Sequence, residues 1–446
     1  MSQDPPPRQR LLASTLRRSP NSEGGLRAVL ANSGWLLLDK LFRIGISILV
    51  GAWVARHLGP ARYGELAYVL ALLALFQAAC TLGLDGPVVR DVSRDAKGSG
   101  VILGSALWLR VGAGFIAWLL AVITVIAMRP GDWAALTMVA IAGASLVLQP
   151  AEIVDLWLQS QSQSRLSVPS RLAAYCVVAL FKVYMILTDA PLWAFAAAAL
   201  LDAMLIAVAL ALVYARRPNP TPWNWDRCTA RRLLVESWPF MLSAISVGIY
   251  MRIDQVMLRE LAGERQLGLY SAIMPFSQGW YVIPMTLYAS ILPRLSQLHQ
   301  QAPHRYQARL QQAFTMMAWG GVAAAGLTVA FAPWLITVLL GPRFEEAVPI
   351  LQWHAVTNVF VFMGVAQSLA IVSERTPRLA LIKTLIGVVV NVLANMFFIP
   401  RWGAIGSAWA AAICQCCSVV LSNIFLAPRA FRMQIRAFFP FRQVSL

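Results

Sequence analysis

The sequence has few charged residues, and this shortage restricts the class of protein more than any single motif does. Only 13% of its 446 residues are charged, whereas 59% are hydrophobic, and the mean hydropathy is +0.64. Soluble proteins carry about 25% charged residues. A chain so poor in charge is therefore expected to lie in a membrane.

The sequence also lacks the patterns on which most enzymes and metal proteins depend. No P-loop, HExxH, GxSxG or paired-cysteine zinc spacing occurs. The C-x-C-C run at 414–417 has no histidine or acidic residue nearby, so its cysteines are interpreted as small residues that pack between helices. We predict no catalytic residue, no cofactor and no metal site.

Long apolar stretches separated by short polar breaks are abundant. A membrane-spanning helix needs about 20 mostly apolar residues, and twelve stretches meet this requirement. They are 28–55, 64–85, 101–127, 133–158, 169–188, 192–214, 234–261, 268–292, 309–340, 349–373, 378–399 and 404–427. The expected fold class is an all-α polytopic membrane protein.

The basic residues are distributed unevenly among the breaks. Of the 37 lysine and arginine residues, 25 lie in the two termini and the alternate breaks that would share their side, and 7 lie in the opposite turns. Cytoplasmic loops are enriched in such residues, so both termini are predicted to be cytoplasmic. The net charge of +17 is then a sign of topology, and no nucleic-acid partner is expected.

Two parts of the chain open in the same way. The segment 236–272 is apolar but carries Arg252 and Asp254 before a turn with glycine and tyrosine, and the segment 32–68 carries Asp39, Lys40 and Arg43 before a similar turn. We therefore expect two related halves. The predicted division is a disordered segment 1–27, a six-helix half 28–214, a cytoplasmic linker 215–233, a six-helix half 234–427 and a cytoplasmic tail 428–446.

Several motifs occur in an order that is typical of one family. They are ARHLGPARYGELAY, LGLDGPVVRDVSR, RIDQVMLREL followed by LGLY, LLGPRFEEAVPIL and PRWGAIGSAWAA. With them the chain resembles Wzx-like flippases, the polysaccharide transporter branch of the multidrug/oligosaccharidyl-lipid/polysaccharide exporter superfamily. The resemblance covers most of residues 28–427 and implies a V-shaped, alternating-access transporter in the inner membrane.

The resemblance also implies a substrate and partners. The substrate would be an undecaprenyl-pyrophosphate-linked oligosaccharide for O-antigen, capsule or exopolysaccharide synthesis, and the partners would be the lipid bilayer, a polysaccharide polymerase and a chain-length regulator. Three alternatives remain open: a cation-coupled multidrug exporter, a lipid II flippase, and a polytopic glycosyltransferase or polymerase. The predicted outer turns, each shorter than ten residues, leave little room for the last.

Five basic side chains lie inside predicted spans, where charge is costly and usually functional. Because lysine and arginine bind phosphate oxygens, we expect them to form a cationic cavity for the pyrophosphate. They are Lys40, Arg43, Arg110, Lys182 and Arg252. Ion pairing within the bundle is the alternative interpretation.

Two carboxylates within the spans are candidates for coupling transport to an ion gradient, namely Asp202 and Asp254. Asp254 is preferred because it shares a helix face with Tyr250, Ser246 and Ser243. On an ideal helix Arg252 points to another side, so the sequence leaves open which of the two faces a cavity.

Overall fold

A computed structural model of the protein describes residues 22–95, 98–161, 167–216 and 222–439, with side chains from residue 42 onward. Helices are the regular secondary structure of these residues. The N-terminal half contains α2 (Ser22–Cys80), α3 (Asp85–Arg94), α4 (Ser99–Met128), α5 (Trp133–Gly143), α6 (Ser145–Leu148), η1 (Gln149–Glu152), α7 (Ile153–Ser160), α8 (Val168–Leu187) and α9 (Leu192–Ala215).

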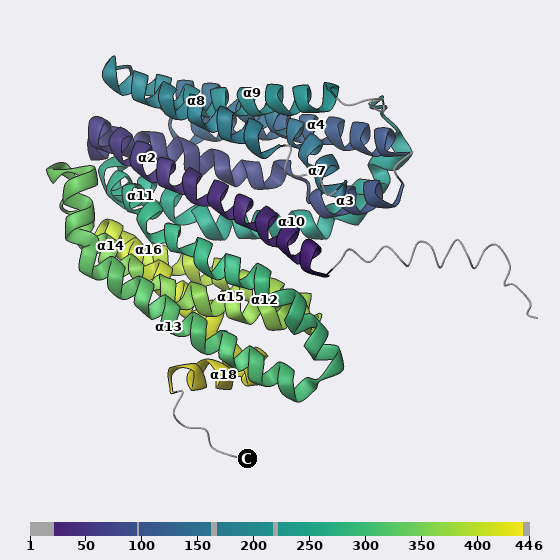
Figure 1. Ribbon diagram of the computed structural model, residues 1–446. Helices are drawn as coiled ribbons and strands as arrows, with labels where there is room; N and C mark the ends of the chain where they lie inside the picture. Colours follow the sequence, from purple (N-terminus) through teal and green to yellow (C-terminus); the bar gives the residue numbers. More distant parts are fainter. Residues whose placement is uncertain (1–21, 96–97, 162–166, 217–221, 440–446) are drawn as a thin grey trace, which may run out of the picture.

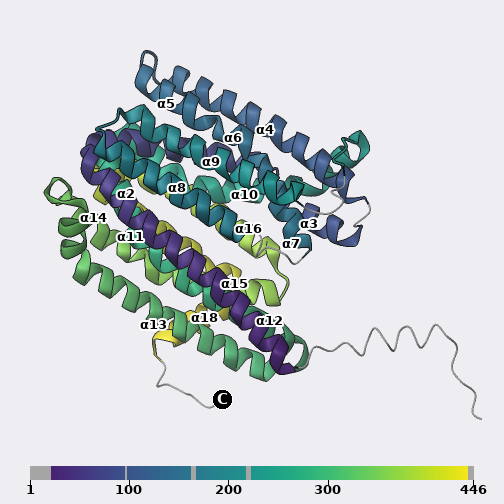
Figure 2. The same cartoon turned by 45° about the horizontal axis from the view of Figure 1, so that its top comes forward.

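The C-terminal half follows after the break at 216–226. It contains α10 (Arg227–Ala262), α11 (Glu264–Gln278), η3 (Gly279–Tyr281), α12 (Val282–Gln301), α13 (Pro303–Leu335), η4 (Ile336–Leu340), η5 (Pro342–Phe344), α14 (Ala347–Ala355), α15 (Thr357–Ser373), α16 (Pro377–Cys416), η6 (Cys417–Leu421), α17 (Ser422–Leu426) and α18 (Pro428–Phe438). Figures 1 and 2 show the two groups of helices lying side by side.

The described helices account for the twelve expected spans. Among the described residues, nine stretches are long and apolar enough to cross a membrane, and two of these, Phe42–Arg94 and Pro377–Leu426, each contain two spans. Glycines with non-helical backbone angles, Gly59 and Gly403, break these two stretches. The twelfth span is the α11–α12 stretch. The predicted all-α polytopic fold is confirmed.

The helix boundaries differ from the sequence division at three places. Residues 1–21 of the segment expected to be disordered lie outside the described residues, and α2 already begins at Ser22. Within the expected linker, α10 begins at Arg227, because the Asp226 carboxylate accepts a hydrogen bond from the Thr229 N–H at 2.7 Å and caps the helix. Hydrogen bonding by Thr229 also lowers the pKa of Asp226. The expected tail contains α18.

The two ends of the bundle are defined by where the helices break. One end is called here the Gly59 end. A Cβ placed on Gly59 would lie 3.8 Å from the Arg343 side chain, and a Cβ placed on Gly341 would lie 3.4 Å from the Arg56 side chain. At the other end, called the Ala302 end, the chain turns from α12 into α13. The short helix α3 also lies at this end. These ends lie to the left and right of Figure 1.

The halves repeat one local structure at the Gly59 end. Gly59 (φ 74°, ψ 169°) and Gly263 (φ 87°, ψ 173°) separate the first and second long helices of their halves, in a backbone region that favours glycine. Five residues later, Gly64 and Gly268 face each other. A Cβ on Gly64 would lie 2.9 Å from the Gly268 nitrogen, and one on Gly268 would lie 3.0 Å from the Gly64 nitrogen. Helices α2 and α11 therefore meet backbone to backbone across the halves.

Candidate functional site

A cavity of about 450 Å³ lies between the halves, beside the Gly64–Gly268 contact. Helix α2 supplies one wall, and α10, α11 and η3 supply the other. The lining residues are Ile44, Ser47, Ile48, Tyr63, Leu66, Ala67, Leu70, Ala71, Arg252, Gln255, Ser271, Met274, Pro275, Gln278 and Gly279. The cavity thus draws on both halves, as an alternating-access site would.

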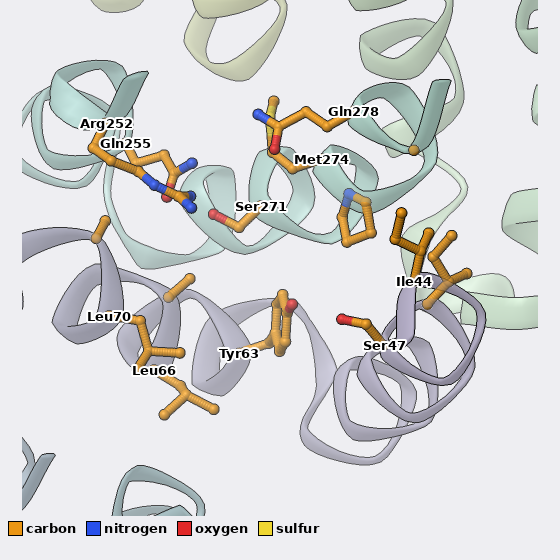
Figure 3. A pocket seen from close by; sticks show the side chains of 15 residues that line it. Ile44, Ser47, Tyr63, Leu66, Leu70, Arg252, Gln255, Ser271, Met274 and Gln278 are labelled. Atoms are coloured by element: carbon orange, nitrogen blue, oxygen red, sulfur yellow. The ribbon is translucent and has the colours of Figure 1, made fainter. Parts of the chain in front are cut away.

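The polar groups of this cavity are unequally distributed between its walls. Arg252 and Gln255 project from α10 beside Ser271 of α11, and Tyr63 of α2 lies across from them (Figure 3). Arg252 is the one charged side chain among the described lining residues. The cavity is therefore cationic, with neutral hydrogen-bonding groups around the charge.

Asp254 does not line this cavity, although it lies two residues from Arg252. Its side chain is 8% exposed and accepts hydrogen bonds from the Tyr270 hydroxyl at 2.6 Å and from the Gln255 N–H at 2.8 Å. The structure thus answers the question that the sequence left open: Arg252 faces the central cavity, and Asp254 faces the interior of the C-terminal half.

A buried polar chain continues from Asp254. The Tyr270 ring contacts the His354 imidazole edge to face, with 5.8 Å between centroids, and His354 Nδ1 lies 2.8 Å from the Ser277 hydroxyl. Sequence reasoning did not identify His354, because a single histidine in an apolar helix forms no recognisable pattern. Its intramembrane position was the available signal.

Arg110 lies apart from the central cavity. It is 5% exposed and donates a hydrogen bond to Asp85, beside a small space of about 40 Å³ that Gln149 and Glu152 also line. Its Nε has no partner among the described residues. Arg171 in turn lies 3.4 Å from Asp155, so oppositely charged groups alternate in this part of the N-terminal half.

Arg43 of α2 and Lys182 of α8 both interact electrostatically with one carboxylate, Asp202 of α9. Asp202 also lines a second cavity of about 230 Å³. Its Oδ1 has no hydrogen-bond partner among the described residues. The Lys40 side chain lies outside the described residues. The four basic residues whose side chains are described are therefore distributed over three places, and among these four Arg252 is the one at the interface of the halves.

Contacts between the halves close the Gly59 end. Arg129 at the end of α4 lies 2.7 Å from Glu260 of α10, and its guanidinium lies over the Tyr68 ring. Arg56 of α2 also donates a hydrogen bond to the Val338 carbonyl at 3.3 Å. Together with the glycine contact, these groups join the two halves at the Gly59 end.

Comparison with known proteins assigns the family. The profile of a family described as a polysaccharide biosynthesis protein matches residues 53–349. The chain belongs to this family. No curated protein matches the chain.

Solved transporters share the fold of this family member. An inward-facing multidrug resistance MATE transporter of the MOP superfamily gives a TM-score of 0.73 at 14% identity, covering 88% of this chain and 96% of its own. The lipid II flippase MurJ, in an inward closed conformation, gives 0.69 at 12% identity over 90% of each chain. An outward-facing MATE transporter gives 0.60 at 15% identity, with 90% and 96% covered. The family profile confirms the expected polysaccharide family, and these structures confirm the expected transporter fold.

Proposed function

We propose that the protein is a flippase that moves undecaprenyl-pyrophosphate-linked oligosaccharides across the inner membrane for surface polysaccharide synthesis. The observation that carries this proposal is the cavity between the halves, in which Arg252 is the single described charge. A guanidinium binds pyrophosphate oxygens through paired hydrogen bonds. Gln255, Ser271, Gln278 and Tyr63 offer the neutral donors and acceptors that sugar hydroxyls require.

The charge of the cavity also favours this function over the export of cationic drugs. A site for organic cations is expected to place carboxylates against the ligand, besides an aromatic face such as that of Tyr63. The described lining contains no carboxylate, and Asp254 is turned away from it. An anionic substrate fits the observed charge better.

The proposed topology places the Ala302 end in the cytoplasm, because the excess of basic residues lies in the breaks at that end. Closure at the Gly59 end then leaves the cavity to receive substrate from the cytoplasmic side. In spheroplasts, a cysteine at position 190 or 402 should react with an impermeant maleimide, and one at position 225 should react only after permeabilisation. The reverse labelling would contradict this topology.

The function is tested on the purified protein in proteoliposomes, with a fluorescent undecaprenyl-pyrophosphate oligosaccharide as substrate. Arg252→Ala should lower the initial rate of flipping at least about tenfold, because the pyrophosphate loses a charged partner. Arg252→Lys should recover part of the rate, since charge persists without the fork geometry.

The matched control is Arg265→Ala, which removes an exposed arginine of α11 outside the cavity lining and should leave the rate within about twofold. Wild-type rates in Arg252→Ala would remove this arginine from the substrate path. Transport of an organic cation in place of the lipid-linked sugar would overturn the proposed function.

A further inference from the structure

A second groove, remote from the central cavity, lies between α12 and α13 towards the Ala302 end. Its volume is about 340 Å³, and none of its lining residues is shared with the central cavity. The lining residues are Ser290, Ile291, Arg294, Leu295, Leu298, Arg309, Gln312, Ala313 and Met316.

Two arginines occupy matching positions on the two walls. Arg294 precedes the helix break at Ala302 by eight residues and Arg309 follows it by seven, so a rise of about 1.5 Å per residue places both at the same depth. This depth is where the apolar spans 268–292 and 309–340 end, which is the level of lipid head groups.

The groove has the charge and shape of an anion site with an apolar extension. Both arginines are exposed, and no described lining residue is a carboxylate. Arg309 Nη1 donates to Gln312 Oε1 at 3.0 Å, which occupies one of the five N–H donors of its guanidinium. Ile291, Leu298 and Met316 line the rest of the groove.

We propose that this groove binds the phosphate of an anionic glycerophospholipid from the leaflet at the Ala302 end. Arg294 and Arg309 would each contact the phosphodiester, and the acyl chains would lie along Ile291 and Met316. A phospholipid is favoured over a soluble anion because the charge lies at head-group depth and continues into an apolar groove. The inference depends on the membrane location of the chain and is independent of the transported substrate.

Native mass spectrometry of the full-length protein in detergent tests this proposal, with phosphatidylglycerol as the probe and phosphatidylcholine as the neutral reference. Wild-type protein should retain phosphatidylglycerol preferentially. Arg294→Gln and Arg309→Gln should each weaken its binding about fivefold, and the double variant about 25-fold. Arg294→Lys and Arg309→Lys should keep most of the affinity, since the attraction is largely one of charge.

Arg305→Gln is the matched control, because this exposed arginine of α13 lies outside the groove lining and its loss should leave binding unchanged. Equal phosphatidylglycerol affinity in wild type and double variant would overturn the proposal. A second result would also overturn it. If undecaprenyl pyrophosphate bound to the wild type but not to the double variant, and phosphatidylglycerol did not displace it, the groove would be a substrate site. The flipping rate of Arg252→Ala tests the proposed function, whereas phosphatidylglycerol binding tests the groove. Failure of one proposal therefore leaves the other standing.

Discussion

In the N-terminal half, the described charges within the bundle lie near charges of opposite sign, whereas in the C-terminal half three buried side chains, Asp254, His354 and Lys383, make their hydrogen bonds to neutral groups. Arg110 is paired with Asp85, and Asp202 interacts electrostatically with Lys182, Arg43 and Arg171. On the other side, three groups rely on neutral hydrogen bonds: Asp254 on Tyr270, His354 on Ser277, and Lys383 on Gln367 and Asn423.

This difference suggests a division of labour between the halves. A carboxylate beside two cations can be displaced by a substrate phosphate, because the cations keep a negative partner throughout. A carboxylate held by a hydroxyl and an N–H can gain or lose a proton without separating an ion pair. We infer that the cations of the N-terminal half give the substrate anion a further binding place besides Arg252 of the central cavity, and that Asp254 of the C-terminal half is coupled to an ion gradient.

The largest effect is expected where the halves meet. Gly268→Leu would place a Cβ 1.7 Å from the Pro60 carbonyl oxygen and 3.0 Å from the Gly64 nitrogen, so the Gly59 end could no longer close as it does here. Overpacking costs about 1–3 kcal/mol, which shifts a two-state equilibrium about 5- to 150-fold. Spin labels at positions 189 and 345 should report longer distances between the halves, and flipping should fall in proportion.

Gly326→Leu is the control for this change, because a Cβ on this α13 glycine meets no atom within 4 Å. It should leave the label distances unchanged. If Gly268→Leu gave wild-type distances and rates, the α2–α11 contact would have no part in the transport cycle.

Asp202→Asn tests the exchange of anions in the N-terminal half. The change leaves Lys182 and Arg43 without the negative charge of Asp202, so undecaprenyl pyrophosphate should bind about tenfold more tightly and leave more slowly, which lowers turnover. Binding is measured by fluorescence quenching and turnover in proteoliposomes. Glu345→Gln, at an exposed carboxylate, is the control. Weaker binding in Asp202→Asn would show that Asp202 orders the cations rather than competing with the substrate.

Asp254→Asn tests coupling in the C-terminal half. The asparagine oxygen can still accept the Tyr270 hydroxyl hydrogen bond, so the helices should keep their packing. The neutral amide cannot take up a proton or attract a cation by its charge, and its NH2 group replaces the oxygen that accepts from the Gln255 N–H. Substrate exchange without a gradient should persist, whereas stimulation by an imposed proton or sodium gradient should be lost. Unchanged gradient dependence would exclude Asp254 as the coupling residue.

The contrast between the halves follows only in part from the sequence. Apolar length and the distribution of lysine and arginine predict the spans, since these are properties of single segments. The charged residues deep within the spans can also be identified from the sequence, because a charge at membrane depth is costly and needs a partner. Their pairing is not visible: Asp85 and Arg110, or Asp202 and Arg43, come from different helices, whose packing no single segment encodes.

The orientation of Arg252 and Asp254 shows where an ideal helix suffices and where it does not. A straight helix correctly places the two side chains on different faces, as the structure shows. Choosing which face meets the cavity requires the positions of α2 and α11. Neutral partners such as Gln367 and Asn423 are harder still to identify, because an amide in an apolar helix carries no charge that demands an explanation.

The smallest effect on stability is expected from a change at Lys383. This change tests directly whether the ammonium is held by neutral groups alone. Lys383→Met removes a buried ammonium, but Gln367 Nε2 still donates to Asn423 Oδ1 at 2.8 Å, and Asn423 Nδ2 to the Val419 carbonyl at 2.7 Å. The free energy of unfolding should change by less than about 1 kcal/mol. Asn423→Leu leaves the ammonium with fewer acceptors and should destabilise the protein by about 2–3 kcal/mol.

Thermal unfolding in detergent, followed by tryptophan fluorescence, measures both changes. A smaller loss of stability in Lys383→Met than in Asn423→Leu would identify a cation that is held by neutral acceptors. If Lys383 were paired with a carboxylate, its removal would leave that carboxylate uncompensated and would cost more stability. A loss in Lys383→Met as large as in Asn423→Leu would indicate that Lys383 has an anionic partner. In that case the C-terminal half would resemble the N-terminal half, and the division of labour between them would no longer follow from their buried charges.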